Sequence, residues 1–369
     1  MNRLYTTLAL FFLISVSGVL YLFSGQQTFP SSAKPQTPTA PYDYIVEDFK
    51  IHSVDQETII GGTLTLPQGQ GPFPAAILLS VAGPNDRDQA FAGHRGFHVL
   101  ADHLTKNGFA VARYDDRGIG VSGGSYFDAS WEDYASDANA VAQFLGKDLR
   151  INPDKIGFIG MSQGGPIGAL ASVKYEPAAF VVLLSAPGLN GPEALSLQLE
   201  NTLAISGIQG DQANQYRALF TEFMSIVQRD PSSTQTRVQL IKFLNGPGRA
   251  LIPAYQFMPK DTEGLADVLL GPWYQSNLNF DPVKTYSPIS SRVLALGGSL
   301  DLIAPPSQHL VAISDLYKQT QHQNITTIEI DGLNHLLQEA VTGLPTEYAK
   351  LENSFSDSAL DAITQWLKE

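Results

Sequence analysis

Residues 155–165 read Lys-Ile-Gly-Phe-Ile-Gly-Met-Ser-Gln-Gly-Gly, and this stretch decides the fold. The apolar run 156–159 predicts a buried parallel strand. Gly160, Ser162 and Gly164 then form the pattern G-x-S-x-G, in which a strand turns abruptly into a helix. The turn strains the backbone of the serine, and glycines two positions to either side avoid a collision. Ser162 is therefore the predicted nucleophile; the alternative is an ordinary glycine-rich turn.

Composition narrows the classes of protein that this chain can belong to. With 369 residues, 43% of them hydrophobic, it can form one large α/β domain or two ordinary ones. It has no cysteine, which excludes disulfides, thiolate metal sites and a cysteine nucleophile. The net charge is −13 with only 23 lysines and arginines, so we expect no nucleic-acid partner.

The N-terminus carries a targeting segment. No charged residue lies between Leu4 and Phe23, and Arg3 precedes them. A run of this length can cross a bilayer, which favours a retained membrane anchor at 1–24 over a cleaved signal segment. The positive-inside rule then makes the body extracytoplasmic, at the periplasmic or cell surface, or secreted if the segment is cleaved. Residues 25–41 are predicted to be a flexible linker.

The remaining chain alternates strands and helices. Alternating apolar residues in 42–67 predict antiparallel strands at one edge of a sheet. Further strands are expected at 75–81, 109–114, 156–159, 180–184, 293–296 and 325–330, with helices at 93–106, 131–145, 163–175, 306–317 and 356–367. This order predicts a mostly parallel sheet flanked by helices. Residues 188–288 break the rhythm and are predicted to form an inserted helical cap, which divides the core into 42–187 and 289–369.

Two strand ends supply partners for Ser162. Catalytic groups in such sheets gather at the carboxyl ends of the strands, and Asp301 and His335 follow the last two strands there. Histidine can accept and return the proton of the serine, and a carboxylate on its far nitrogen fixes the tautomer. We therefore assign His335 as the base and Asp301 as the acid. Asp331 and Glu193 are the alternative acids.

An oxyanion needs two backbone donors beside the nucleophile. The amide of Gln163, directly after Ser162, is the first. We choose Ala82 as the second because it follows the strand 75–81, while Pro84 has no amide hydrogen.

Other polar residues allow competing interpretations. His94 and His98 stand four apart and could suggest a metal site, but the H-E-x-x-H pattern is missing. The loops 86–88 and 115–117 could bind a charged substrate; an ion-pair network that holds them rigid is favoured. One helical face of the cap could line an acyl pocket, although core packing is the default. Its residues are Leu219, Phe220, Phe223, Met224 and Val227.

These motifs resemble a known family. The stretches 80–88, 113–118, 160–165 and 332–338 are similar to those of EstD-type carboxylesterases in the α/β-hydrolase superfamily, near the serine aminopeptidase-like group. The resemblance covers about 45–369. It implies an α/β-hydrolase fold and a Ser-Asp-His hydrolase of short acyl esters without metal or organic cofactor. The chain departs from the family at 81–83, where Val-Ala-Gly replaces Gly-Ser-Gly, and this bears on the second oxyanion donor.

Three functions follow as hypotheses. The first is a serine carboxylesterase acting on small-molecule esters. The second is a serine aminopeptidase, which would need carboxylates of the cap, such as Glu200, Glu222 or Asp267, to hold a substrate ammonium group. The third is a non-catalytic surface binding protein on the same fold.

Overall fold

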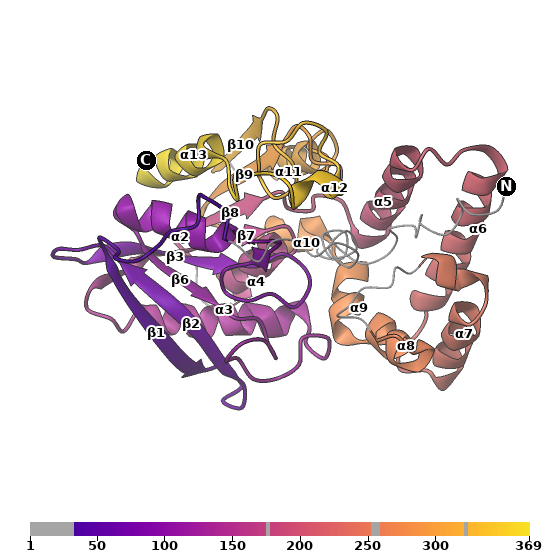
Figure 1. The fold of residues 1–369 in the computed structure, drawn as a ribbon. Coiled ribbons are helices and arrows are strands. Elements are labelled where there is room, and N and C mark those ends of the chain that lie inside the picture. The colour runs from indigo at the N-terminus through magenta and orange to yellow at the C-terminus, as the bar shows by residue number, and fades with distance from the viewer. Residues whose placement is uncertain (1–32, 175–177, 252–258, 321–323) are drawn as a thin grey trace.

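The computed structural model describes residues 33–174, 178–251, 259–320 and 324–369 (Figure 1). Its centre is a sheet of eight strands in the order β1-β2-β6-β3-β7-β8-β9-β10. The strands are β1 (Ile45–His52), β2 (Ile59–Leu66), β3 (Phe73–Leu79), β6 (Ala110–Tyr114), β7 (Ile151–Met161), β8 (Phe180–Leu184), β9 (Arg292–Gly298) and β10 (Ile325–Ile330). β2 runs antiparallel to β1 and β6, and the other neighbours are parallel.

The central strands are apolar because both of their faces are covered. All five residues of β8 are buried, as expected of a parallel strand between two helical layers. On one face lie α2 (Gly96–Lys106) and α13 (Asp357–Lys368); on the other lie α3 (Trp131–Leu145), α4 (Gly164–Lys174) and α11 (His309–Gln319). The mostly parallel sheet flanked by helices is confirmed.

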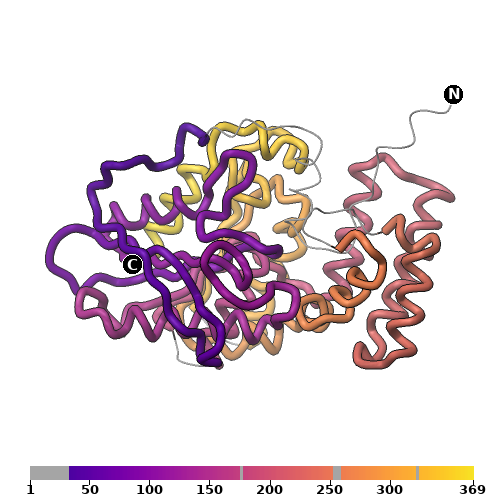
Figure 2. The backbone as a smooth tube through the Cα atoms, turned by 60° about the horizontal axis from the view of Figure 1, so that its bottom comes forward, coloured from indigo at the N-terminus to yellow at the C-terminus, as the bar shows by residue number. Residues whose placement is uncertain are grey.

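Between β8 and β9 the chain forms helices only, within the residues described there. They are α5 (Gly191–Ile205), α6 (Gly210–Val227), α7 (Thr234–Leu244), the 3-10 helix η1 (Pro247–Leu251), α8 (Thr262–Leu270), α9 (Pro272–Leu278) and α10 (Pro282–Tyr286). Figures 1 and 2 show α5 to α8 as a lobe to one side of the sheet. The apolar face of α6 packs inside this lobe: the ring of Phe223 lies 6.1 Å from that of Phe243 and 6.2 Å from that of Tyr274.

Short elements outside the sheet depart from the sequence-based expectations. Ala90–Phe91 (β4) pairs with His94–Arg95 (β5), so the helix expected from residue 93 begins at Gly96. Near the C-terminus, α12 spans Pro345–Tyr348. Such short pieces have no periodic pattern, which is why they were not foreseen.

The segment before β1 is attached to the core at its described residues. The Lys34 amide donates to Gly93 O at 3.0 Å, and the Lys34 ammonium donates to Ala349 O at 3.0 Å. Gln36 Oε1 accepts from the amides of Ser354 and Phe355 at 2.8 and 3.0 Å. This part of 25–41 is therefore docked, which differs from the flexible linker predicted there.

The predicted anchor lies outside the described residues. Among the helices from residue 33 onward that the structure describes, none has the length and apolarity to cross a membrane.

Candidate active site

Ser162 stands on a strained turn between β7 and α4. Its φ is +52°, a value that costs a residue with a side chain about 1 kcal/mol or more. A Cβ on Gly160 would lie 2.0 Å from Gly164 O, and a Cβ on Gly164 would lie 2.2 Å from Leu79 O. Only glycine fits at either position, as the sequence pattern predicted.

His335 and Asp301 form a fully buried pair at the ends of β10 and β9. His335 Nδ1 lies 2.7 Å from Asp301 Oδ2. The other carboxylate oxygen, Oδ1, accepts from the amides of Ile303 and Ala304 at 2.9 and 2.8 Å. These bonds orient the carboxylate, which then holds the proton of the ring on Nδ1 and leaves Nε2 free to act as a base.

Ser162 and His335 border one cavity of about 80 Å³. His335 Nε2 is buried and has no hydrogen-bond partner among the described residues. The walls come from the strand ends and from the cap; they are Trp131, Gln163, Ser185, Pro187, Gly191, Ala194, Leu195, Gln198, Trp273, Tyr274, Asn277, Phe280, Ile303, Ala304 and His309. The serine and the histidine with an unpaired ring nitrogen therefore border the same cavity.

The two predicted oxyanion donors lie beside this turn with their amides unused. Neither the Gln163 amide nor the Ala82 amide donates to another residue that the structure describes. The next amide along, that of Gly83, donates to the Tyr126 hydroxyl at 2.6 Å and so cannot serve an oxyanion. Gln163 borders the cavity, whereas Ala82 is fully buried and is not part of its wall.

Tyr126 was not foreseen from the sequence. Its oxygen accepts from the Gly83 amide, from Gln163 Nε2 at 3.2 Å and from Trp273 Nε1 at 3.1 Å. It thus joins the loop after β3, the nucleophile turn and the cap. Tyr126 lies in a loop before α3, where neither periodicity nor the strand-end rule could single it out.

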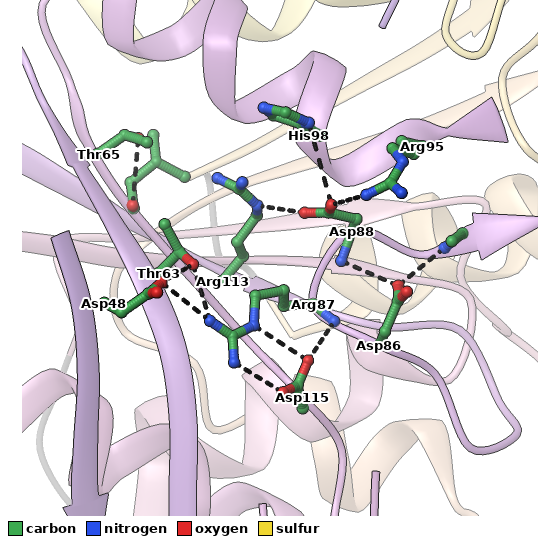
Figure 3. Close-up of polar contacts among 12 residues, drawn as sticks. Asp48, Thr63, Thr65, Asp86, Arg87, Asp88, Arg95, His98, Arg113 and Asp115 are labelled. Carbon is green, nitrogen blue, oxygen red and sulfur yellow. Dashed lines mark hydrogen bonds and ion pairs between the residues drawn. The ribbon is translucent and has the colours of Figure 1, made fainter. Parts of the chain in front are cut away.

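The charged loops flanking the site form ion pairs, as the sequence analysis favoured (Figure 3). Arg87 contacts Asp115 at 2.7 Å and Asp48 at 3.1 Å. Asp88 contacts Arg113 at 2.8 Å, and it pairs with Arg95 at 2.7 Å. The charges of Arg87, Asp88 and Asp115 are therefore satisfied within the protein, which supports the structural role of these residues over the binding of a charged substrate.

Asp116 lies in the same region and has no basic partner among the residues that the structure describes. Burial raises its pKa to about 7, although bonds from the Asn85 amide and the Ser80 hydroxyl, both at 2.8 Å, favour the ionised form. Arg117, the next residue, pairs with Asp137 at 2.6 Å.

The other acids and histidines considered from the sequence lie elsewhere. Asp331 accepts from Ser299, and Glu193 is exposed in the first turn of α5, so neither contacts His335. Exposed Glu200 and Asp267 pair with arginines of the cap at 2.7 and 2.8 Å, and Glu222 is exposed on α6. None of them lines the cavity.

His94 has structural partners. Its ring nitrogens lie 3.0 Å from Ser354 Oγ and from Tyr348 O. Within the described ranges, no three His, Asp or Glu side chains are placed to hold a metal ion.

This sheet order, with the strained serine turn after β7, is the α/β-hydrolase fold. The family described as serine aminopeptidase, S33, matches residues 92–237. Esterase EstD of Thermotoga maritima is 41% identical over 56 residues, which make up 15% of this chain and 14% of that esterase. The chain thus resembles the esterase group of α/β hydrolases over these segments.

Solved structures share the fold at low sequence identity. The α/β hydrolase GrgF of Penicillium superposes with a TM-score of 0.54 at 18% identity, over 88% of this chain and 98% of that one. An esterase of Pyrococcus furiosus superposes with a TM-score of 0.52 at 14% identity, over 91% and 97%. At these identities the likeness concerns the fold.

Proposed function

We propose that this chain is a serine carboxylesterase that cleaves short-chain esters through Ser162, His335 and Asp301. One observation carries the proposal: the buried His335–Asp301 pair leaves an unpartnered Nε2 on the same cavity as a serine held at φ +52°. A hydroxyl, a base and an orienting carboxylate in this order are the parts that acyl transfer needs.

The reaction follows from these positions. Ser162 Oγ attacks the ester carbonyl while His335 Nε2 takes its proton, and Asp301 stabilises the imidazolium that forms. The amides of Gln163 and Ala82 stabilise the oxyanion. His335 then returns the proton to the leaving alcohol, and an acyl group remains on Ser162 Oγ. A water molecule, deprotonated by His335, releases the acid and restores the hydroxyl.

The size of the cavity supports a short acyl chain. Its volume of about 80 Å³ is roughly half that of an engineered cavity that binds benzene. This favours short acyl groups, whereas a long alkyl chain would need the cap to move.

The test uses p-nitrophenyl butyrate and the full-length chain. We expect wild-type hydrolysis and a fall of kcat by about 10⁴-fold or more in Ser162→Ala. Ser172→Ala is the matched control, because Ser172 Oγ bonds to Ala169 O within α4. A fluorophosphonate should label Ser162, located by peptide mass spectrometry. Wild-type turnover in Ser162→Ala would refute the proposal, and an unlabelled Ser162 would favour the binding-protein hypothesis.

Hydrolysis of amino-acyl anilides distinguishes the aminopeptidase alternative from the esterase. Because the acids of the cap considered for ammonium binding are exposed and lie off the cavity, we expect alanine p-nitroanilide to be cleaved far more slowly than the ester. Comparable kcat/KM values for both substrates would make the chain an aminopeptidase.

We also propose an extracytoplasmic location, by an anchor at Leu4–Phe23 or by secretion after its cleavage. The support is the uncharged run itself, preceded by Arg3. Cell fractionation together with the N-terminal sequence of the mature chain tests it, and a full-length chain in the cytoplasmic fraction would contradict it.

A further inference from the structure

The cavity beside Ser162 is rich in polar side-chain atoms without partners. Five of its wall residues carry such an atom among the described residues: Trp131 Nε1, Ser185 Oγ, Tyr274 Oη, His309 Nε2 and His335 Nε2. A buried polar group left unpaired costs about 1–3 kcal/mol, so native proteins keep few of them. Only His335 has a role in the mechanism above, and the others are available to bond a ligand or an ordered water.

His309 borders this cavity and carries a donor without a partner among the described residues. Its Nδ1 accepts the Gly188 amide at 3.0 Å, so in the neutral ring the proton resides on Nε2. Burial lowers the pKa of His309 to about 4, and the ring is therefore neutral at pH 7. The residue is buried, with 3% of its surface exposed. Nε2–H is thus a fixed donor that no described residue uses.

Ser185 presents a second polar group at the end of the neighbouring strand. It follows β8 directly, its φ is +47°, and 4% of it is exposed. Strained backbone at a residue with a side chain is concentrated at functional sites. Ser162 and Ser185 therefore stand on strained turns at the ends of adjacent strands, and both border the cavity.

The wall of the cavity carries no charge that could bind an ion. Among the described residues that line it there is no Lys, Arg, Asp or Glu. A carboxylate or an ammonium group on the substrate would be left unpaired there, which is costly in a buried site. The ligand that fits is neutral and supplies acceptors.

We propose that the cavity binds an acyl group whose chain carries a neutral hydrogen-bond-accepting oxygen, an ether or a ketone, held by His309 Nε2–H and the Ser185 hydroxyl. This inference rests on the serine esterase function proposed above. The acyl side is assigned because the acyl group stays on Ser162 Oγ through both half-reactions, whereas the alcohol departs after the first. A site built to bond a substrate oxygen rejects the analogue that lacks it, because its own buried groups are then left unpaired.

The test compares esters of matched shape on the full-length chain. One pair is p-nitrophenyl methoxyacetate and butyrate, and the other is p-nitrophenyl 4-oxopentanoate and 4-methylpentanoate. Each kcat/KM is divided by the rate constant for hydroxide hydrolysis of that ester, which removes intrinsic reactivity. We expect wild type to prefer the oxygenated member of at least one pair by tenfold or more.

Variants assign the preference to the two side chains. Asn at 309 can still accept the Gly188 amide but cannot place a donor where Nε2–H stands, so His309→Asn should reduce the preference to below threefold. Ser185→Ala should reduce it in the same direction. Ser287→Ala removes a buried unpartnered hydroxyl away from the cavity and should leave the preference unchanged. Because each preference is a ratio within one variant, incomplete folding does not affect it.

The outcomes are distinct. Hydrolysis of butyrate that depends on Ser162, with no preference in either pair, overturns this inference and leaves the proposed esterase intact. A preference that survives both substitutions overturns the assignment to His309 and Ser185. A preference for 2-methoxyethyl acetate over butyl acetate, without a preference on the acyl side, overturns the assignment of the oxygen to the acyl group. Hydrolysis that persists in Ser162→Ala refutes the proposed function itself.

Discussion

Replacing Tyr126 with phenylalanine tests how the loop after β3, which carries the Ala82 and Gly83 amides, is held in place. The hydroxyl accepts three donors, and its removal leaves the Gly83 amide and Gln163 Nε2 without acceptors. Trp273 Nε1 keeps a second acceptor, Gln163 Oε1, at 3.1 Å. Two buried donors left unpaired cost about 1–3 kcal/mol each, so we expect Tyr126→Phe to lower the unfolding free energy by about 2–6 kcal/mol.

The effect on catalysis is expected to be separate from this loss of stability. The Gly83 amide adjoins Ala82, whose amide is the proposed second oxyanion donor, and loss of one such donor costs about 3 kcal/mol of transition-state stabilisation. In Tyr126→Phe the Ala82 amide is still present, but the loop after β3 that carries it is displaced. We therefore expect kcat to fall by about 10- to 100-fold with little change in KM, measured on p-nitrophenyl butyrate after urea denaturation has established the folded fraction.

Tyr317→Phe is the matched control. Tyr317 is buried on α11 and donates to Tyr286 O at 3.1 Å, outside the wall of the cavity. Its substitution should cost about 1 kcal/mol of stability and leave kcat unchanged. If Tyr126→Phe folds and retains kcat within twofold of wild type, the loop at 82–83 is not positioned by this tyrosine.

Three further perturbations probe the frame around the site. Gly164→Ala places a Cβ 2.2 Å from Leu79 O, so the backbone must shift; we expect a loss of about 3 kcal/mol in urea denaturation, and unchanged stability would contradict the contact. Asp88→Asn leaves buried Arg113 without its charged partner and should cost about 3 kcal/mol, measured the same way. The pKa of Asp116, about 7, lies above its unfolded value of 3.8, so wild-type stability should fall as pH rises from 4 to 7, by about 4 kcal/mol for this group. Asp116→Asn should flatten this part of the pH profile, and an unaltered slope would refute the assignment.

Elements with strong patterns were predictable to the residue. The strands 180–184 and 325–330 and the helix 131–145 have the bounds that their apolar spacing indicated. In contrast, β7 begins at Ile151, five residues before the expected strand. Asn152-Pro153-Asp154 resembles a turn, but the register shift between Phe73 and Ala75 lets Ile151 pair with β3. That irregularity is set by the neighbouring strand and leaves no local signal.

The residues of the candidate site also fall into two groups, those that the sequence could predict and those that it could not. Asp301 and His335 each follow a strand, so the strand-end rule selected them, and Ser185 follows one too and could have been selected by it. Tyr126 and His309 come from a loop and from the first turn of α11, and what each contacts depends on how the cap packs. Their contacts could not be derived from the spacing of residues along the chain.

The docked N-terminal segment limits the distance that could separate the catalytic domain from a membrane. If Leu4–Phe23 were held in a bilayer, only residues 24–33 would separate it from Lys34, which is fastened at Gly93 and Ala349. Ten extended residues reach at most about 35 Å. The edge of the protein beside α2 and α12 would then lie close to the lipid headgroups. Truncation at residue 42 would release the protein from the membrane and would also remove the hydrogen bonds of Lys34 to this edge.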